Sequence, residues 1–248
     1  MQAEKLSVLR AFLAKPELED ATPRIPLGHD AADAYLKGGL ERGTLHEVYS
    51  AIGHEAAATG FTAGLAMRVM ENKHLLWIAQ DFAATEFGAL SATGLLELGF
   101  DPSRLLMLCV ANADDGLRAA SDALTCQALG AVVIEISGQP KILDLTTSRR
   151  LTLAAAQKAV TVFLLRFAAK PSASTAETRW LVRGAASLHQ DENWGQPVFK
   201  VELMRNRHGQ TGEWIMEWNG DERIFKAPNT DNQTAKADHR SLVSAATY

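Results

Sequence analysis

The stretch EVYSAIGHEAAATGFTAGLA, residues 47–66, joins an apolar segment, a glycine-containing loop and a helical pattern. A strand, such a loop and a helix make up a nucleotide-binding P-loop, whose signature G-x-x-x-x-G-K-[ST] ends in glycine, lysine and a hydroxyl residue. The residues matched to that ending are Gly60, Phe61 and Thr62, so phenylalanine stands at the lysine position. The pattern predicts a strand-to-helix turn of an α/β protein. It leaves open whether the loop is a disabled ATP site or one that never bound phosphate.

Apolar segments of strand length follow this turn. They read HLLWIA (74–79), LLMLCVA (105–111), AVVIEIS (131–137) and TVFLLRF (161–167). Helical patterns lie around them at 59–70, 87–98, 114–129 and 145–158. Because the apolar segments do not alternate with polar residues, we expect both of their faces to be buried. The sequence therefore predicts an α/β fold with a mainly parallel sheet and flanking helices.

The C-terminal part has a different pattern. The segments VFKVELMRN (198–206) and GEWIMEWN (212–219) alternate apolar and polar residues around a short polar loop. This alternation predicts an antiparallel hairpin. We expect an N-terminal helix and arm at 1–26, a core at 27–225 and a disordered polar tail at 226–248. The N-terminal helix carries an apolar stripe of Leu6, Leu9 and Phe12.

The composition is that of an ordinary globular protein, with 47% hydrophobic residues and a net charge of −4 over 248 residues. No apolar run approaches the roughly 20 residues that span a bilayer, and the first residues lack a secretory signal pattern. We therefore expect a cytoplasmic protein that does not enter a membrane. Cys109 and Cys126 lack the spacing of a zinc site or a redox pair, so we expect both in the core.

Several segments, taken in order, carry a family resemblance. They are LGHDAADAYLKGGLERGTLHEVY (27–49), ATGF (58–61), LGFDPSRLL (98–106), SRRL (148–151), ETRW (177–180) and ELMRNRHGQTGEWIMEW (202–218). The first and the last resemble the entry and the closing strands of a RecA-type core. More narrowly, their order and spacing resemble the ImuA family over about residues 27–225.

The resemblance implies a function. ImuA-like proteins are accessory proteins of SOS-induced, error-prone translesion DNA synthesis. Their partners are ImuB, an inactive relative of Y-family polymerases, and an error-prone C-family polymerase, and we add RecA as an expected partner. The resemblance thus implies a non-catalytic adaptor that acts in the cytoplasm, at the nucleoid during DNA damage.

ATP hydrolysis by a RecA-type core needs a lysine on the phosphates and a glutamate that activates water. No lysine occurs between residues 47 and 69, and Glu55 stands at the first glycine of the matched signature. Gln80 takes the place of the water-activating glutamate in the resemblance, and Glu135 lies near the place of the aspartate behind the metal. We therefore predict a pseudo-ATPase that binds neither ATP nor magnesium.

DNA in RecA-like filaments lies against two loops, whose equivalents here are residues 138–150 and 168–178. Neither loop contains an aromatic residue that would stack on a base, so we expect DNA contact to be indirect. The candidate phosphate or partner contacts are Lys141, Arg149, Arg150, Arg166 and Lys170. Trp194 and the stripe of Leu6, Leu9 and Phe12 are candidate protein contacts.

Two other functions stay open at this point. One is an active RecA-type ATPase with an atypical phosphate loop, which would need a cation supplied by a neighbouring molecule. The other is an SOS cell-division inhibitor, since such inhibitors are thought to be related to the RecA core. The longer core of this chain favours the adaptor over the inhibitor.

Overall fold

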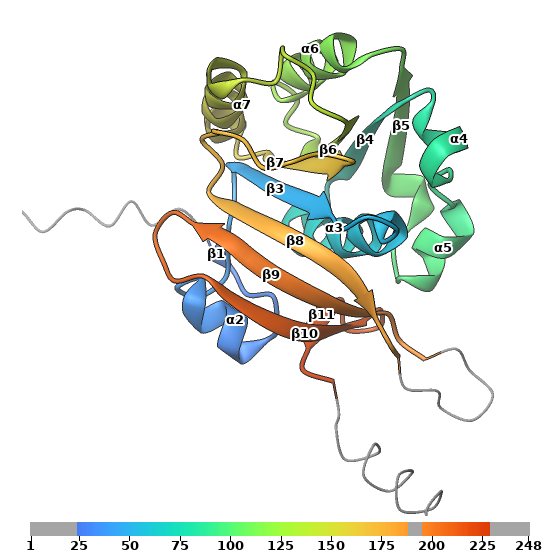
Figure 1. Cartoon of the computed structure of the whole chain (residues 1–248), viewed down its shortest axis with the longest axis vertical. Helices are drawn as coiled ribbons and strands as arrows, with labels where there is room; N and C mark the ends of the chain where they lie inside the picture. Colours follow the sequence, from blue (N-terminus) through green and yellow to red (C-terminus); the bar gives the residue numbers. More distant parts are fainter. Residues whose placement is uncertain (1–23, 188–194, 229–248) are drawn as a thin grey trace, which may run out of the picture.

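A computed structural model describes residues 24–187 and 195–228 (Figure 1). The predicted stripe of Leu6, Leu9 and Phe12, Trp194 and nearly all of the predicted tail lie outside these residues. The described elements, in chain order, are β1 Arg24–Ile25, α2 Asp30–Tyr35, β2 Leu40–Glu41, β3 Leu45–Ser50, α3 Glu55–Met70, β4 His74–Gln80, α4 Ala83–Phe87, α5 Ala92–Glu97, the 3-10 turn η1 Pro102–Arg104, β5 Leu105–Val110, α6 Ala113–Ala123, β6 Leu129–Ser137, α7 Leu145–Lys158, β7 Thr161–Phe167, β8 Thr178–Ala185, β9 Val198–Asn206, β10 Gly212–Asn219 and β11 Ile224–Lys226.

A nine-stranded sheet organises the fold, with the strand order β11-β10-β9-β8-β3-β7-β6-β4-β5. The six strands β8, β3, β7, β6, β4 and β5 are parallel to one another. Strands β9, β10 and β11 extend the sheet beyond β8, and each of them pairs antiparallel with its neighbour. The predicted α/β fold, with its mainly parallel sheet, flanking helices and C-terminal hairpin, is confirmed. Strand β3 lies in the middle of the sheet and is parallel to both of its neighbours. The loop that follows it therefore lies at the carboxyl ends of the parallel strands, where α/β proteins bind their ligands.

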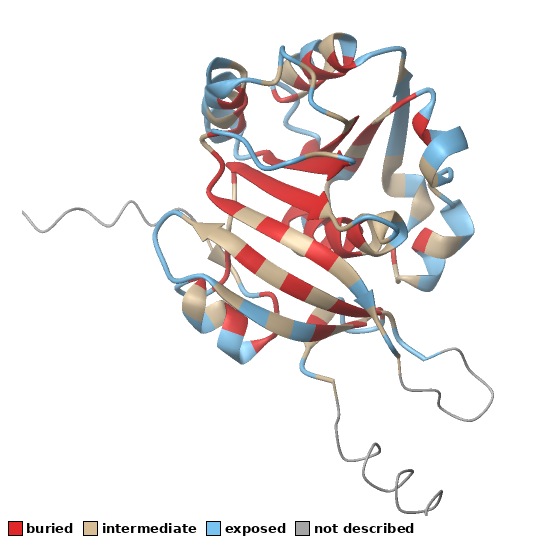
Figure 2. Cartoon of the chain, viewed as in Figure 1, coloured by how far each residue is buried: buried red, intermediate tan, exposed pale blue. Residues whose placement is uncertain are grey.

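Each face of the sheet has its own apolar core. Helix α3 covers one face, where Phe61 packs with residues such as Val133 and Phe163. Helices α6 and α7 cover the other face. There Leu151 packs in a second cluster with every other residue of β6 and β7, such as Ile134. Because both faces are covered, the central strands are buried along their whole length, which is why their sequences read as continuous apolar runs (Figure 2).

Strand β5 is the exception, and the prediction that residues 105–111 form a buried strand is wrong. It lies at the edge of the sheet, and Leu106, Met107 and Leu108 are 50%, 46% and 36% exposed. Cys109, in the same strand, and Cys126 are also exposed, so their predicted place in the core is wrong. An apolar run alone does not distinguish a central strand from an edge strand.

Three helices differ from their predicted bounds. Helix α3 begins at Glu55, before the predicted residue 59. Of the helix predicted at 87–98, only α5 at Ala92–Glu97 forms, because Phe87 ends α4 and the link between the two helices contains Gly88, whose φ of 92° interrupts a right-handed helix. Helix α6 ends at Ala123, well before the predicted residue 129, and its first turn is capped by the side chain of Asn112. Helix α7 and strands β7, β9 and β10 have the predicted bounds. Among the described residues, no helix combines the length and the apolar composition that a membrane crossing requires.

Candidate functional site

The loop between β3 and α3 is only four residues long, because β3 ends at Ser50 and α3 begins at Glu55. A P-loop places its lysine and hydroxyl residue in the first turn of the helix that follows. The eight-residue signature then falls on SAIGHEAA, residues 50–57. Ser50 and Glu55 occupy the two glycine positions of this structural match, and Ala56 and Ala57 occupy those of lysine and the hydroxyl residue.

The residues matched to the signature from the sequence lie further along α3. Gly60, Phe61 and Thr62 lie in the second turn of α3 and not at the end of a loop. The Phe61 side chain is fully buried, with its ring centroid 5.0 Å from that of Phe225 and 5.6 Å from that of Trp180. Thr62 Oγ1 donates to Ala58 O at 2.7 Å inside the same helix. Phe61 and Thr62 belong to the buried face of α3, where Phe61 packs against aromatic residues of β8, β9 and β11, whereas Gly60 is half-buried.

Three backbone amides of the loop, those of Ala51, Gly53 and His54, already have acceptors within the protein. A P-loop needs such amides free to surround phosphate oxygens. Here the N–H groups donate to the following acceptors: Ala51 to Val182 O at 3.0 Å, Gly53 to Glu55 Oε1 at 3.3 Å, and His54 to Ala51 O at 3.0 Å. The Glu55 carboxylate thus takes up an amide that a phosphate would use, and its charge opposes a polyphosphate at the start of α3.

Gln80 and Glu135 lie at the carboxyl ends of β4 and β6, as the sequence predicted. Gln80 Oε1 accepts a hydrogen bond from Ser137 N at 2.9 Å. Glu135 Oε2 accepts one from Trp77 Nε1 at 3.2 Å, and burial raises the pKa of the Glu135 carboxyl. Gln80 therefore holds two strand ends together, and Glu135 sits in apolar surroundings that favour its protonated form.

A cavity of about 640 Å³ lies beside these residues, at the carboxyl ends of the parallel strands. Its walls come from the first turns of α3, from the link between α4 and α5, and from the ends of β6, β7 and β8. None of the described residues that line it is basic, and Glu135 is the titratable side chain among them. The cavity therefore offers apolar contacts and one carboxyl group, but no cation for a phosphate.

A buried charged cluster lies on the opposite face of the sheet. Arg179 Nε donates to Glu47 Oε2 at 2.6 Å, and both side chains are largely buried. Arg166 is 2% exposed, and its guanidinium donates to Ile136 O at 3.3 Å and to Gly138 O at 2.6 Å. The same guanidinium lies 5.6 Å from the Tyr49 ring centroid. We therefore replace the expected phosphate contact of Arg166 with a structural role.

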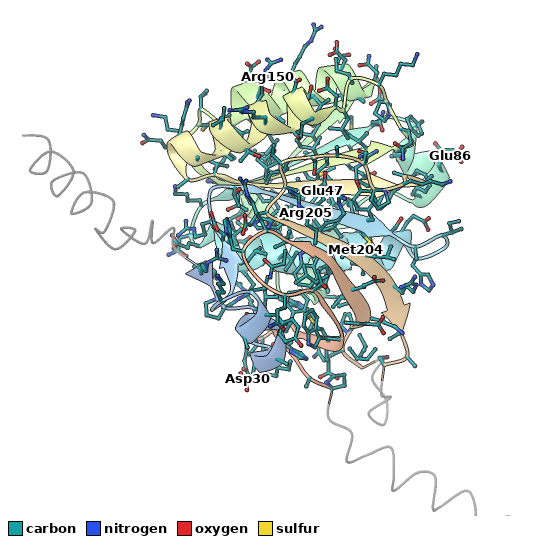
Figure 3. All side chains as sticks on the ribbon, turned by 60° about the vertical axis from the view of Figure 1, so that its left-hand side comes forward. Asp30, Glu47, Glu86, Arg150, Met204 and Arg205 are labelled. Atoms are coloured by element: carbon teal, nitrogen blue, oxygen red, sulfur yellow. The ribbon has the colours of Figure 1, made fainter. Side chains whose placement is uncertain are left out.

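The other candidate basic residues lie on the surface. Lys141, Arg149, Arg150 and Lys170 are all exposed, and Arg150 lies on the outer side of α7, far from the buried Glu47 (Figure 3). The two loops that carry the candidate contacts are adjacent, because Gln139 Nε2 donates to Lys170 O at 2.7 Å. The structure thus brings Lys141 and Lys170 to neighbouring loops and places Arg149 and Arg150 on the helix that follows the first of them.

One cluster among the described residues has metal-binding side chains. Ligand atoms of Glu41, Glu177 and His208 lie within 4.8 Å of one another. Arg24 already occupies this cluster, because its Nη2 is 2.7 Å from Glu41 Oε2 and 3.8 Å from Glu177 Oε1. Burial, with the charge of Glu41, raises the pKa of the Glu177 carboxyl. We interpret the cluster as an ion-pair network, because the arginine supplies the positive charge that a metal would bring.

Comparison with known proteins gives a family. No family model matches the chain. Two curated relatives, each called Protein ImuA and each from a strain of Caulobacter vibrioides, are 32% identical over 215 residues. These matches cover 79% of this chain and 84% of the relatives. The chain belongs to the ImuA family.

The sequence pattern of this ImuA-family chain did not point to two parts of the site. Ala56 and Ala57 align with the lysine and hydroxyl positions of a P-loop only if α3 begins at Glu55, and the sequence pattern did not indicate that start. The pair of Glu47 and Arg179 was also missed, although a charged residue inside an otherwise apolar strand is a signal for a buried partner. The partner of Glu47 lies 132 residues away in the sequence, so only the fold identifies it.

Proposed function

We propose that this chain is a non-catalytic accessory protein of SOS-induced, error-prone translesion DNA synthesis. Its 32% identity along 84% of the Caulobacter ImuA proteins carries the proposal. In this role it is an adaptor that binds an ImuB-like relative of Y-family polymerases, RecA and an error-prone C-family polymerase. Such a role places its action in the cytoplasm, at the nucleoid when DNA is damaged.

The proposed adaptor is a pseudo-ATPase with a RecA-like core. Three observations support this part of the proposal. Ala56 and Ala57 stand where a P-loop has its lysine and hydroxyl residue, and the amides of Ala51, Gly53 and His54 donate within the protein. Gln80, at the end of β4, has an amide where hydrolysis needs a base. We therefore propose that neither ATP nor magnesium is a cofactor of this protein.

DNA contact in this proposal is indirect. The candidate loops present lysines and arginines but no aromatic residue for base stacking, and Arg166 is engaged with backbone carbonyl groups. Any contact through Lys141, Arg149, Arg150 and Lys170 would be to phosphates, and it would weaken as salt rises. A binding constant for single-stranded DNA that is insensitive to salt would contradict this mode.

Purification of the tagged full-length chain from damaged and undamaged cells tests the proposed function. We expect the ImuB-like protein to co-purify after damage. A version that lacks residues 1–15 tests the predicted N-terminal stripe, which lies outside the described residues. Loss of every partner on truncation would assign docking to that stripe, and retention would assign it to the core. Recovery of a tubulin-like division protein in place of the ImuB-like protein would contradict the proposed function.

A further inference from the structure

The cavity beside α3 has the size and shape of a binding site. Its volume of about 640 Å³ falls within the range of about 300–1,000 Å³ that is typical of ligand pockets. Phe87, Leu95 and Phe167 provide large apolar walls, and small residues of α3 form the floor. Ala56 of α3 and Ala89 of the link between α4 and α5 both line the cavity and are exposed, so the cavity reaches the surface at these residues.

Small residues on α3 keep this cavity open. Ala56, Ala57, Gly60 and Ala63 line it, so the first two turns of the helix present almost no side-chain volume toward it. A Cβ atom at Gly60 would lie 3.5 Å from Phe199, which is an ordinary contact, so the backbone does not require glycine there. A larger side chain on the open side of this helix would fill the cavity and leave the aromatic core around Phe61 in place.

Acidic residues in and beside the cavity oppose the binding of anionic ligands. Glu135 lines it, and the first turns of α3 and α4 carry Glu55 and Glu86. Glu86 directly precedes Phe87 of the cavity wall and lies at the outer edge of the molecule (Figure 3). Since none of the described lining residues is basic, the phosphates of a nucleotide would find no cation in the cavity and would lie near the acidic side chains beside it. A cation, in contrast, would stabilise the ionised form of the Glu135 carboxyl, which burial alone disfavours.

We propose that this cavity is the docking site for a segment of the partner protein that presents one or two large apolar side chains next to a lysine or arginine. The proposal deepens, and rests on, the proposed adaptor function. The apolar side chains would displace water from the walls formed by Phe87, Leu95 and Phe167. The cation would pair with Glu135, whose Oε2 is already held by Trp77 Nε1. A buried aromatic or aliphatic anchor in a preformed pocket is the usual centre of a protein interface.

Binding of the purified ImuB-like partner to the full-length chain tests this inference. Ala56→Trp and Ala89→Trp each place an indole in the cavity from an exposed position. We expect each substitution to weaken the affinity by about tenfold or more, as occlusion of an anchor pocket does. Glu135→Gln keeps the acceptor for Trp77 but removes the charge. We expect it to weaken binding and to reduce the effect of salt on the remaining affinity.

Ile52→Trp is the matched control, because Ile52 is 94% exposed in the loop before α3 and does not line the cavity. Its affinity should equal that of the wild type. Unchanged affinity of both cavity variants, with a wild type that binds, would overturn the inference and leave the adaptor function standing. Failure of the wild type to bind the ImuB-like partner would overturn the adaptor function, and the inference with it. Thermal unfolding of each variant confirms that lost binding is not lost folding.

Discussion

Gln80 Oε1 accepts a hydrogen bond from the backbone N–H of Ser137 at 2.9 Å, which joins the carboxyl end of β4 to that of β6. These strands are neighbours in the sheet, and their last paired residues are Ile78 and Ile134. The side chain of Gln80 therefore continues the connection where the backbone pairing has stopped. A residue expected at the position of a catalytic base thus has a structural role in this protein.

Gln80→Leu removes this acceptor and leaves the half-buried Ser137 N–H without its side-chain partner. We expect a loss of about 1 kcal/mol in the free energy of unfolding, which is the usual net contribution of one hydrogen bond. Gln80→Glu retains an acceptor oxygen and should keep the wild-type stability at neutral pH. Urea unfolding of the two variants measures the difference. Equal stability of Gln80→Leu and the wild type would show that the bond does not hold the strand ends together.

Substitutions at Phe61 and Ala56 distinguish two alignments with the P-loop signature. The lysine position falls on Phe61 in the sequence alignment and on Ala56 in the alignment from the structure. Phe61→Lys would restore the lysine of the sequence match, but it places an ammonium group in a fully buried aromatic core. We expect it to lower the free energy of unfolding by about 3–5 kcal/mol or more. Ala56→Lys, at an exposed position, should change it by no more than about 0.5 kcal/mol. A stable Phe61→Lys protein in thermal or urea unfolding would contradict the alignment from the structure.

The buried pair of Glu47 and Arg179 is expected to be required for folding. Glu47→Gln leaves the Arg179 guanidinium, and the neighbouring Arg166, without a buried counter-charge. Removal of one partner from such a pair costs about 3–5 kcal/mol in the free energy of unfolding. The double variant Glu47→Leu with Arg179→Met should lose less than the sum of its two single variants, because no charge stays behind. Additive losses would show that the two side chains are not coupled.

His46 makes the stability depend on pH. Burial lowers the pKa of its imidazole to about 4, and its ring nitrogens contact Thr178 Oγ1 and Glu41 O, each at 2.8 Å. The unfolded chain, with a histidine pKa of about 6.5, binds more protons than the folded chain between these values. The contribution of His46 is therefore complete above about pH 6.5 and is lost as the pH falls toward 4, a change of about 3 kcal/mol.

Urea unfolding of the wild type and of His46→Gln between pH 7 and pH 4 measures this contribution. Glu135 and Glu177 have raised pKa values and act in the opposite sense at acid pH, but both proteins share that effect. The wild-type stability relative to the variant should decrease through this range. A constant difference between the two proteins would show that the imidazole does not stay neutral in the fold.

Much of the fold could be predicted because its central strands and C-terminal hairpin have distinct patterns. TVFLLRF carries almost no polar residue and is buried on both faces as β7, whereas GEWIMEWN alternates and forms β10. The exposed edge could not be predicted in this way. LLMLCV is as apolar as a central strand, and only the strand order places it as β5 at the edge of the sheet.

The site was harder to predict than the fold. Gly60 suggested the end of a loop, but glycine is also used inside a helix where another group approaches closely. Gly64 shows this use, because a Cβ atom there would lie 2.7 Å from Phe225 Cζ. The start of α3 at Glu55, the cavity beside it and the long-range pair of Glu47 and Arg179 depend on contacts between distant segments. Local sequence patterns do not contain that information.

Equilibrium titration of the full-length chain with a fluorescent ATP analogue and magnesium tests the central claim most directly. Because the amides of Ala51, Gly53 and His54 are occupied and Ala56 stands at the lysine position, we expect no saturable binding up to about 1 mM analogue, a limit near −4 kcal/mol. Ala57→Glu, which adds a carboxylate at the start of α3, should give the same trace as the wild type. Micromolar affinity of the wild type that is abolished by Ala57→Glu would contradict a non-catalytic adaptor and favour an ATPase with an atypical phosphate loop.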